Sequence, residues 1–192
     1  GIIGIVNPNL KNIVLPQNIN NAELKNPIEI LQNTILDIQD EVDMLILLTS
    51  AGVPWNREKV YENFISNIND KDSNELNAIE LGYYATGIDI IVSGGISKGY
   101  PEPWYDPNSH VYTFQNYGGG TSFGHFIIKY DNTSKLFLDY ESAVASQSSQ
   151  TLFVNDFRFN PDVYDSILTI YNKAIDEIYS KIDWTSIIKS DD

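Results

Sequence analysis

Cysteine and histidine, two residue types that often bind transition metals or take part in catalysis, are scarce in this sequence. It has no cysteine and two histidines, His110 and His125, which removes thiolate nucleophiles, disulfides and cysteine-ligated metal sites. The histidines are far apart, and neither has a carboxylate pair at ligand spacing. We therefore expect His110 to be a loop residue and His125 to be a structural or surface residue of a strand.

Two other features, a single aspartate before an apolar run and a triple glycine, favour a structural role over a catalytic one. Asp89 directly precedes an apolar run (IIV), where a carboxylate is expected to cap the backbone or face solvent rather than catalyse a reaction. The triple glycine at 118–120 lacks the lysine and the following helix of a phosphate-binding loop. A tight turn that permits close backbone approach is the expected role of these glycines.

An aromatic cluster in a proline-rich loop is a candidate binding site. Tyr100, Trp104 and Tyr105 lie in a loop that also carries prolines at 101, 103 and 107. Such side chains could form a stacking platform for a sugar or a base. They could equally form a rigid plug that packs the loop onto neighbouring strand ends, and the sequence leaves both interpretations open.

The first half of the chain contains the elements that would position these residues. Three apolar runs are typical of buried strands, and they cover residues 2–6, 43–49 and 88–92. Helical patterns separate the runs, which predicts parallel strands joined by right-handed crossovers. Ligands of such folds bind beyond the carboxyl ends of the strands, so the loops that follow the runs are the expected site.

Cap and turn residues mark the helices. Asn26 followed by Pro27 predicts a helix start, a second helix is expected after Asn56, and a third is expected through residues 76–83. The asparagine-rich stretch before the first helix is expected to be a loop with one short strand near residues 13–15.

The second half of the chain has a different sequence pattern, which predicts antiparallel strands and a final helix. Residues 111–117, 123–130 and 135–142 are expected to form antiparallel strands, with a hairpin turn at 132–134. A long final helix is predicted from Asn160 and Pro161. Its apolar stripe comprises Val163, Ile167, Ile170, Ala174, Ile178 and Ile182. The fold class is therefore α/β, with parallel strands and helices, then antiparallel strands, and a long closing helix.

Composition excludes several partners. The chain has 192 residues with 26 acidic and 12 basic side chains, a net charge of −14, which disfavours nucleic acid and anionic membrane surfaces. Hydrophobic residues make up 42% of it, enough for a packed core. No apolar run is long enough to cross a bilayer, and Asp165, Asp176 and Glu177 on the final helix argue against a membrane anchor. The first residue is Gly1 rather than Met, so we expect a processed or truncated piece of a longer protein.

Four segments together resemble one known family. They are residues 1–8 (GIIGIVNP), 52–55 (GVPW), 87–94 (GIDIIVSG) and 117–125 (YGGGTSFGH). Their order and spacing resemble the second half of the catalytic domain of 5′-nucleotidase-like metallophosphoesterases, in the calcineurin-like superfamily. The resemblance implies half of a layered metallophosphoesterase-type α/β sandwich over residues 1–159. It also implies that residues 160–192 are a linker helix toward a C-terminal domain that is absent from this chain.

The family's metal-binding histidines are not kept. Active relatives hold two divalent metals that orient the phosphoryl group and generate the attacking hydroxide. Aligned on the glycines of the motifs, their histidine positions fall on Ser50, Gly95 and Ser97. Glycine offers no ligand and a serine hydroxyl is a weak one, so we expect no metal, no cofactor and no catalytic residue in this chain.

The resemblance also implies partners and a compartment. The expected partner is the N-terminal half of the same protein, or another chain, that completes the sheet, and self-assembly is a further possibility. Nucleic acid and membrane insertion are not expected. Relatives of this type are periplasmic or cell-surface proteins, which implies the same location here.

Three hypotheses about function follow. The first is a catalytically degenerate 5′-nucleotidase-like unit, a pseudoenzyme with a structural, assembly or binding role. The second is a metal-dependent nucleotide phosphohydrolase that is active only when the missing half supplies most ligands. The third is a cell-surface module whose loop at residues 100–105 binds a glycan or a partner protein.

Overall fold

The computed structural model describes residues 1–19, 22–134, 136–142, 149–151 and 160–181. The chain divides into two compact units, residues 1–152 and residues 153–192. The helices are α1 (Leu10–Ile13), α2 (Pro27–Ile38), α3 (Arg57–Ser66), α4 (Ala78–Tyr83) and α5 (Pro161–Lys181), and short 3-10 turns cover Pro16–Asn18, Gln39–Glu41 and Ser73–Glu75. The strands are β1 (Ile2–Ile5), β2 (Ile46–Thr49), β3 (Ile90–Ser93), β4 (Trp104–Tyr105), β5 (Tyr112–Gln115), β6 (Ser122–Gly124), β7 (Phe126–Asp131), β8 (Leu136–Ser142) and β9 (Ser149–Thr151).

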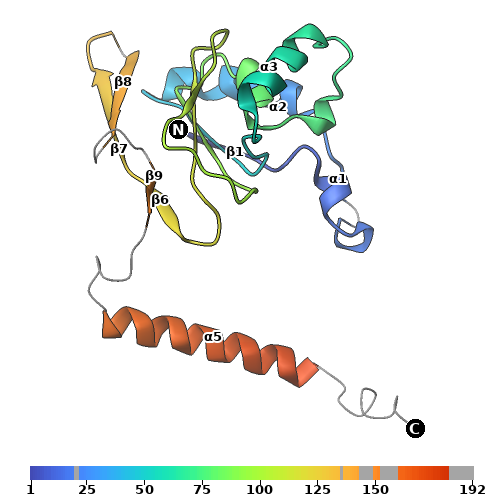
Figure 1. The fold of residues 1–192 in the computed structure, drawn as a ribbon, viewed down its shortest axis with the longest axis vertical. Coiled ribbons are helices and arrows are strands. Elements are labelled where there is room, and N and C mark those ends of the chain that lie inside the picture. Colours follow the sequence, from blue (N-terminus) through green and yellow to red (C-terminus); the bar gives the residue numbers. More distant parts are fainter. Residues whose placement is uncertain (20–21, 135, 143–148, 152–159, 182–192) are drawn as a thin grey trace. The chain divides into compact units, whose positions relative to one another are not determined.

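The first unit contains a five-stranded sheet in the order β1-β2-β3-β5-β4. Figure 1 shows β1 of this sheet beside α2. Strands β1, β2, β3 and β5 are parallel, and β4 joins the edge antiparallel to β5. The predicted α/β class with parallel strands is therefore confirmed. Because the strands follow one another in one direction across the sheet, right-handed crossovers place the connecting helices on one face of it.

The helices begin where the sequence provides caps. The side chain of Asn26 accepts hydrogen bonds from the backbone amides of Ile28 (3.0 Å) and Glu29 (3.4 Å) at the start of α2. At α4, Asn77 and Glu80 form a reciprocal capping box, which satisfies amides that otherwise lack a partner in the first turn.

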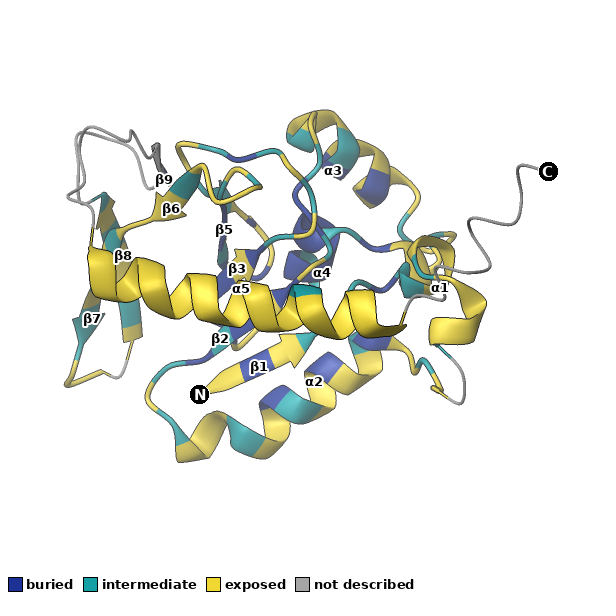
Figure 2. Ribbon diagram, turned by 90° about the horizontal axis from the view of Figure 1, so that it is seen from below, coloured by how far each residue is buried: buried dark blue, intermediate teal, exposed yellow. Residues whose placement is uncertain are grey.

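The core lies between the sheet and these helices. Ile3, Leu47 and Ile91 are paired across β1, β2 and β3, and they pack in one cluster with Leu31 and Ile35 of α2. Figure 2 shows the resulting alternation along β1 between buried and exposed residues. The opposite face of β1, β2 and β3 is more exposed.

Two local predictions are wrong. The short strand expected near residues 13–15 is absent, because Leu10 and Asn12 donate backbone hydrogen bonds to Asn7 and Asn9 and start α1 instead. The strand predicted at 111–117 forms as β5, but it is parallel to β3 rather than antiparallel. The segment 94–111 is long enough to return the chain to the same end of the sheet, which a parallel pairing requires.

The antiparallel elements follow β5. The predicted strand 123–130 is divided at His125 into β6 and β7. Strand β6 pairs with β9, and β7 forms a hairpin with β8, as predicted. In the second unit, α5 begins at the predicted proline and none of its described residues is buried. Lys135 and Ile182, which belonged to predicted elements, lie outside the described residues.

Among the described residues, no helix is both long and apolar enough to cross a membrane.

Candidate functional site

The carboxyl ends of the parallel strands meet at one edge of the sheet, as predicted for a ligand site. After β1, the Asn7 backbone amide donates to the Ser50 hydroxyl (3.0 Å) and its side chain donates to the Ser50 carbonyl (3.1 Å). After β3, the Gly94 amide donates to the Thr49 carbonyl (2.9 Å). The three loops are therefore held together by direct hydrogen bonds.

The three positions that align with family histidines lie at this edge. Gly95 has a φ of +89°, and a Cβ atom built on it would be 2.0 Å from the Ser50 carbonyl oxygen. Ser97 contacts the next loop through its carbonyl, which accepts from the Gly118 amide at 3.3 Å. The fold thus brings Ser50 and Gly95 together and leaves no room for a side chain at position 95.

The residues at this edge do not fit a dinuclear metal site. The Ser50 hydroxyl already accepts from Asn7, and the backbone conformation at Gly95 is one that L side chains rarely adopt. Within the part of the chain that the structure describes, no three histidine, cysteine or acidic side chains are grouped so that they could hold an ion. Divalent metals in phosphoesterases require such imidazole and carboxylate donors.

A buried amide locks two of the loops. The Gln115 side chain is 3% exposed. It accepts from the Val53 amide (2.6 Å) and donates to the Lys98 carbonyl (2.5 Å). One side chain therefore satisfies a backbone donor and a backbone acceptor that come from different loops.

Two cations and several aromatic rings complete the edge. The Lys98 ammonium lies 4.5 Å from the centre of the Trp55 ring and 5.2 Å from that of Tyr100. The Arg57 guanidinium lies 4.6 Å from the Tyr100 ring and donates to the Glu102 carbonyl at 3.0 Å. Trp55 is 75% exposed. Cation–π contacts of this kind hold loops together and favour a positive charge at the surface of an otherwise acidic chain.

The predicted binding loop is divided between core and surface. Tyr100 is half-buried, its hydroxyl donates to the Pro54 carbonyl, and burial raises the pKa of that hydroxyl although Arg57 acts against the shift. Trp104 packs on the Tyr61 ring at 5.1 Å and belongs to the edge of a core cluster. Tyr105 is 44% exposed, and its hydroxyl is 2.7 Å from Nδ1 of His110. The three rings do not share one exposed platform.

The remaining candidate residues have structural contacts. His110 is exposed and has a φ of +63°. His125 is exposed between β6 and β7, and its ring stacks near Phe123. Asp89 accepts from the Leu45 amide at 2.8 Å, and burial raises the pKa of its carboxyl. Residues 118–120 form a turn in which Gly119 and Gly120 have φ of +72° and +68°.

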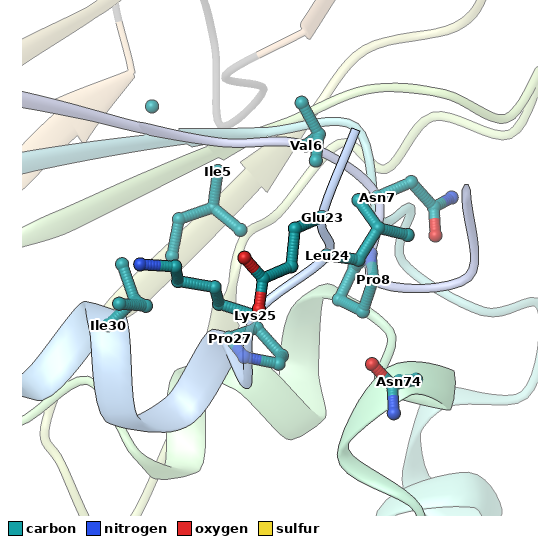
Figure 3. Close-up of a pocket in the computed structure, with 11 residues that line it drawn as sticks. Ile5, Val6, Asn7, Pro8, Glu23, Leu24, Lys25, Pro27, Ile30 and Asn74 are labelled. Carbon is teal, nitrogen blue, oxygen red and sulfur yellow. The ribbon is translucent and has the colours of Figure 1, made fainter. Parts of the chain in front are cut away.

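An apolar recess lies beside the end of β1 (Figure 3), with a volume of about 290 Å³. Its walls come from the end of β1, the segment before α2 and the first turns of α2. Its polar groups are the backbone, Asn7, Glu23, Lys25 and Asn74. None of the predicted site residues lines it.

Sequence reasoning did not identify Arg57, Lys98 and Gln115 as parts of this edge. A signal was present for the first two, since Lys98 is a basic residue in a strand-end loop and Arg57 begins the helix that follows another such loop, in a chain with 12 basic and 26 acidic side chains. Gln115 had no comparable signal, because its role depends on where the fold places the Val53 and Lys98 backbones.

No family model matches the chain, and no curated protein matches it. One similar solved structure is that of a Staphylococcus aureus protein described as a "putative 5′-nucleotidase", in complex with alpha-ketoglutarate. The sequence identity is 15%, the TM-score is 0.49, and the match covers 84% of this chain and 29% of that one. At this level the likeness says nothing about activity.

Proposed function

We propose that this chain is a 5′-nucleotidase-like unit that has lost metal-dependent chemistry and acts in the assembly of a larger protein. The observation that carries the proposal is the contact between Gly95 and Ser50. A Cβ atom at position 95 would be 2.0 Å from the Ser50 carbonyl oxygen. The backbone at this edge therefore leaves no room for a side chain at position 95. A residual catalytic site would instead keep space for a ligand there.

The contacts around the edge support a structural role. Gln115 is buried with both ends of its amide bonded, and Lys98 and Arg57 lie against aromatic rings rather than in an open cleft. The Gln115 amide is thus engaged in holding loops and is not offered to a substrate. The resemblance to 5′-nucleotidase-like metallophosphoesterases supports a periplasmic or cell-surface location as a further part of the proposal.

Metal analysis and a hydrolysis assay on the complete natural protein test this proposal. We expect substoichiometric manganese and zinc, and no turnover of nucleoside monophosphates or of bis-phosphoesters. Stoichiometric metal together with turnover would overturn it. That result would favour the second hypothesis, an enzyme whose missing half supplies the ligands, and activity should then disappear when upstream acidic ligands are replaced.

The third hypothesis, a surface module that binds a glycan or a partner protein, is tested better at Trp55 than at Trp104. Trp104 is packed on Tyr61, so its replacement would disturb the core as well as any binding. Trp55 is 75% exposed, and Trp55→Ala should therefore abolish binding of a glycan or partner without unfolding the chain if the module reading is correct.

A further inference from the structure

Three aromatic rings lie close to the ammonium group of Lys98 at the carboxyl edge of the sheet. The Nζ atom is 4.5 Å from the centre of the Trp55 ring, 5.2 Å from that of Tyr100 and 6.0 Å from that of Tyr117. All three distances fall within the range in which an aromatic ring attracts a cation to its face. Trp55, Tyr100 and Tyr117 are called the ring cluster below.

The Lys98 ammonium has the rings as its partners and no carboxylate. Among the described residues, it forms no ion pair and no hydrogen bond, although the chain has 26 acidic side chains. Arg57, 4.6 Å from the Tyr100 ring, differs in this respect. Its guanidinium is 3.3 Å from the Glu58 carboxylate and donates to the Glu102 carbonyl at 3.0 Å. Of the two cations, Lys98 is therefore the one that another cation can replace without breaking an ion pair.

Backbone contacts fix the positions of two of the rings. The Tyr100 hydroxyl donates to the Pro54 carbonyl, and the Tyr100 amide donates to the Gln115 carbonyl at 3.0 Å. A Cβ atom built on Gly99 would be 2.3 Å from the amide nitrogen of Tyr117, so the loop after β3 lies directly on the backbone that follows β5. The rings are thus held in place before a ligand arrives, which lowers the ordering cost of binding.

The ring cluster is accessible to a ligand from solution. Trp55 is 75% exposed and Tyr117 is 41% exposed, while Tyr100 is half-buried. The net charge of −14 attracts cations to the chain and repels anions from it. Both the rings and the overall charge therefore favour a positively charged ligand.

We propose that the ring cluster is a binding site for a quaternary ammonium group, and that Lys98 is a tethered competitor for this site. A trimethylammonium group is wider and more weakly hydrated than the ammonium of lysine. It can therefore contact several ring faces at once and loses less hydration on binding. Choline and trimethylated lysine both carry such a group. The inference goes beyond the assembly role proposed above and does not depend on it.

Removal of the competitor is the direct test. Titration calorimetry measures the affinity for choline of the complete natural protein and of its Lys98→Ala variant. We expect the natural protein to bind choline and the variant to bind it roughly tenfold more tightly, because the rings lose their tethered ammonium. Lys59→Ala is the matched control, since it removes the same charge from an exposed position of α3. It should leave the affinity unchanged within about twofold.

A neutral analogue separates the effect of charge from apolar contact. In this analogue a carbon atom replaces the choline nitrogen, and we expect no measurable binding to Lys98→Ala. Trp55→Ala in the Lys98→Ala background should abolish the binding of choline, because it removes the ring closest to the ammonium. A trimethyllysine peptide is titrated beside choline. The tighter of these two ligands shows whether the group comes from a modified protein or from a small molecule.

Several results would overturn the proposal. They are the absence of binding of both ligands by Lys98→Ala, equal binding of the neutral analogue, and binding that persists after Trp55→Ala. Equal affinities of the natural protein and Lys98→Ala would overturn the role of Lys98 as a competitor. Lys98→Ser, which also frees the rings, replaces Lys98→Ala if that variant does not fold. These readouts do not involve metal content or turnover, so the inference can fail while the proposed function stands, and the reverse.

Discussion

Gly95 has a backbone conformation, at φ +89°, that L side chains rarely adopt, and the backbone of Ser50 fills the space beside it. Both facts act against any other residue at this position. Gly119 has a similar φ of +72°, but a Cβ atom there would meet nothing within 4 Å. A comparison of substitutions at the two glycines therefore separates the cost of backbone strain from the cost of a steric clash.

Gly95→Ala should destabilise the protein much more than Gly119→Ala. We expect a loss of about 3 kcal/mol or more at Gly95, from strain plus displacement of the Ser50 loop, and about 1 kcal/mol at Gly119, from strain alone. Urea unfolding followed by circular dichroism measures both. Equal losses would mean that the Ser50 loop moves freely, and would weaken the argument that the edge excludes a histidine.

The loops at the carboxyl edge depend on elements that the sequence predicts well and on contacts that it does not. Asn26 and Pro27 predict the start of α2, and the apolar runs predict β2 and β3, because caps and periodicity are local properties. The direction of β5 was predicted wrongly, since it depends on the path of the chain between β3 and β5. The meeting of Ser50 with Gly95 could be expected only by resemblance, and the buried position of Gln115 could not be expected at all.

Gln115→Met tests how far one side chain holds two loops. The replacement keeps a similar volume but leaves the Val53 amide and the Lys98 carbonyl without their partner. We expect a loss of about 2–4 kcal/mol, because each unsatisfied buried backbone group costs about 1–3 kcal/mol. Gln32→Met on the exposed side of α2 is the matched control and should change stability by less than about 0.5 kcal/mol.

The outcome is read from urea unfolding and from the labelling of an added cysteine at Ser97. Loosening of the loops should increase the reactivity of that thiol in the Gln115→Met background. A variant as stable as the parent would mean that solvent reaches both backbone groups and that the amide is not their essential partner.

At the scale of the whole molecule, the order of the strands decides which face of the sheet the helices cover. Because β1, β2, β3 and β5 follow one another in one direction, right-handed crossovers place all connecting helices on the same face. That face holds the core cluster of Ile3, Leu47 and Ile91 with α2. Within the residues described, the other face has the β7–β8 hairpin packed beside β5, and Leu48 and Val92 on that face are 43% and 40% exposed.

Leu31 and Leu36 of α2 test this one-sided arrangement with a single residue type on a single helix. Leu31 is 0% exposed and packs on the sheet, whereas Leu36 is 65% exposed. Leu31→Ala should cost about 2–5 kcal/mol, since it removes buried methyl groups and leaves a cavity between helix and sheet. Leu36→Ala should change stability by less than about 0.5 kcal/mol. The methyl groups that it removes are already in contact with water, and alanine favours the helix. A comparable loss at both positions, in urea unfolding of the natural protein, would show that the outer side of α2 is covered as well as the side that packs on the sheet.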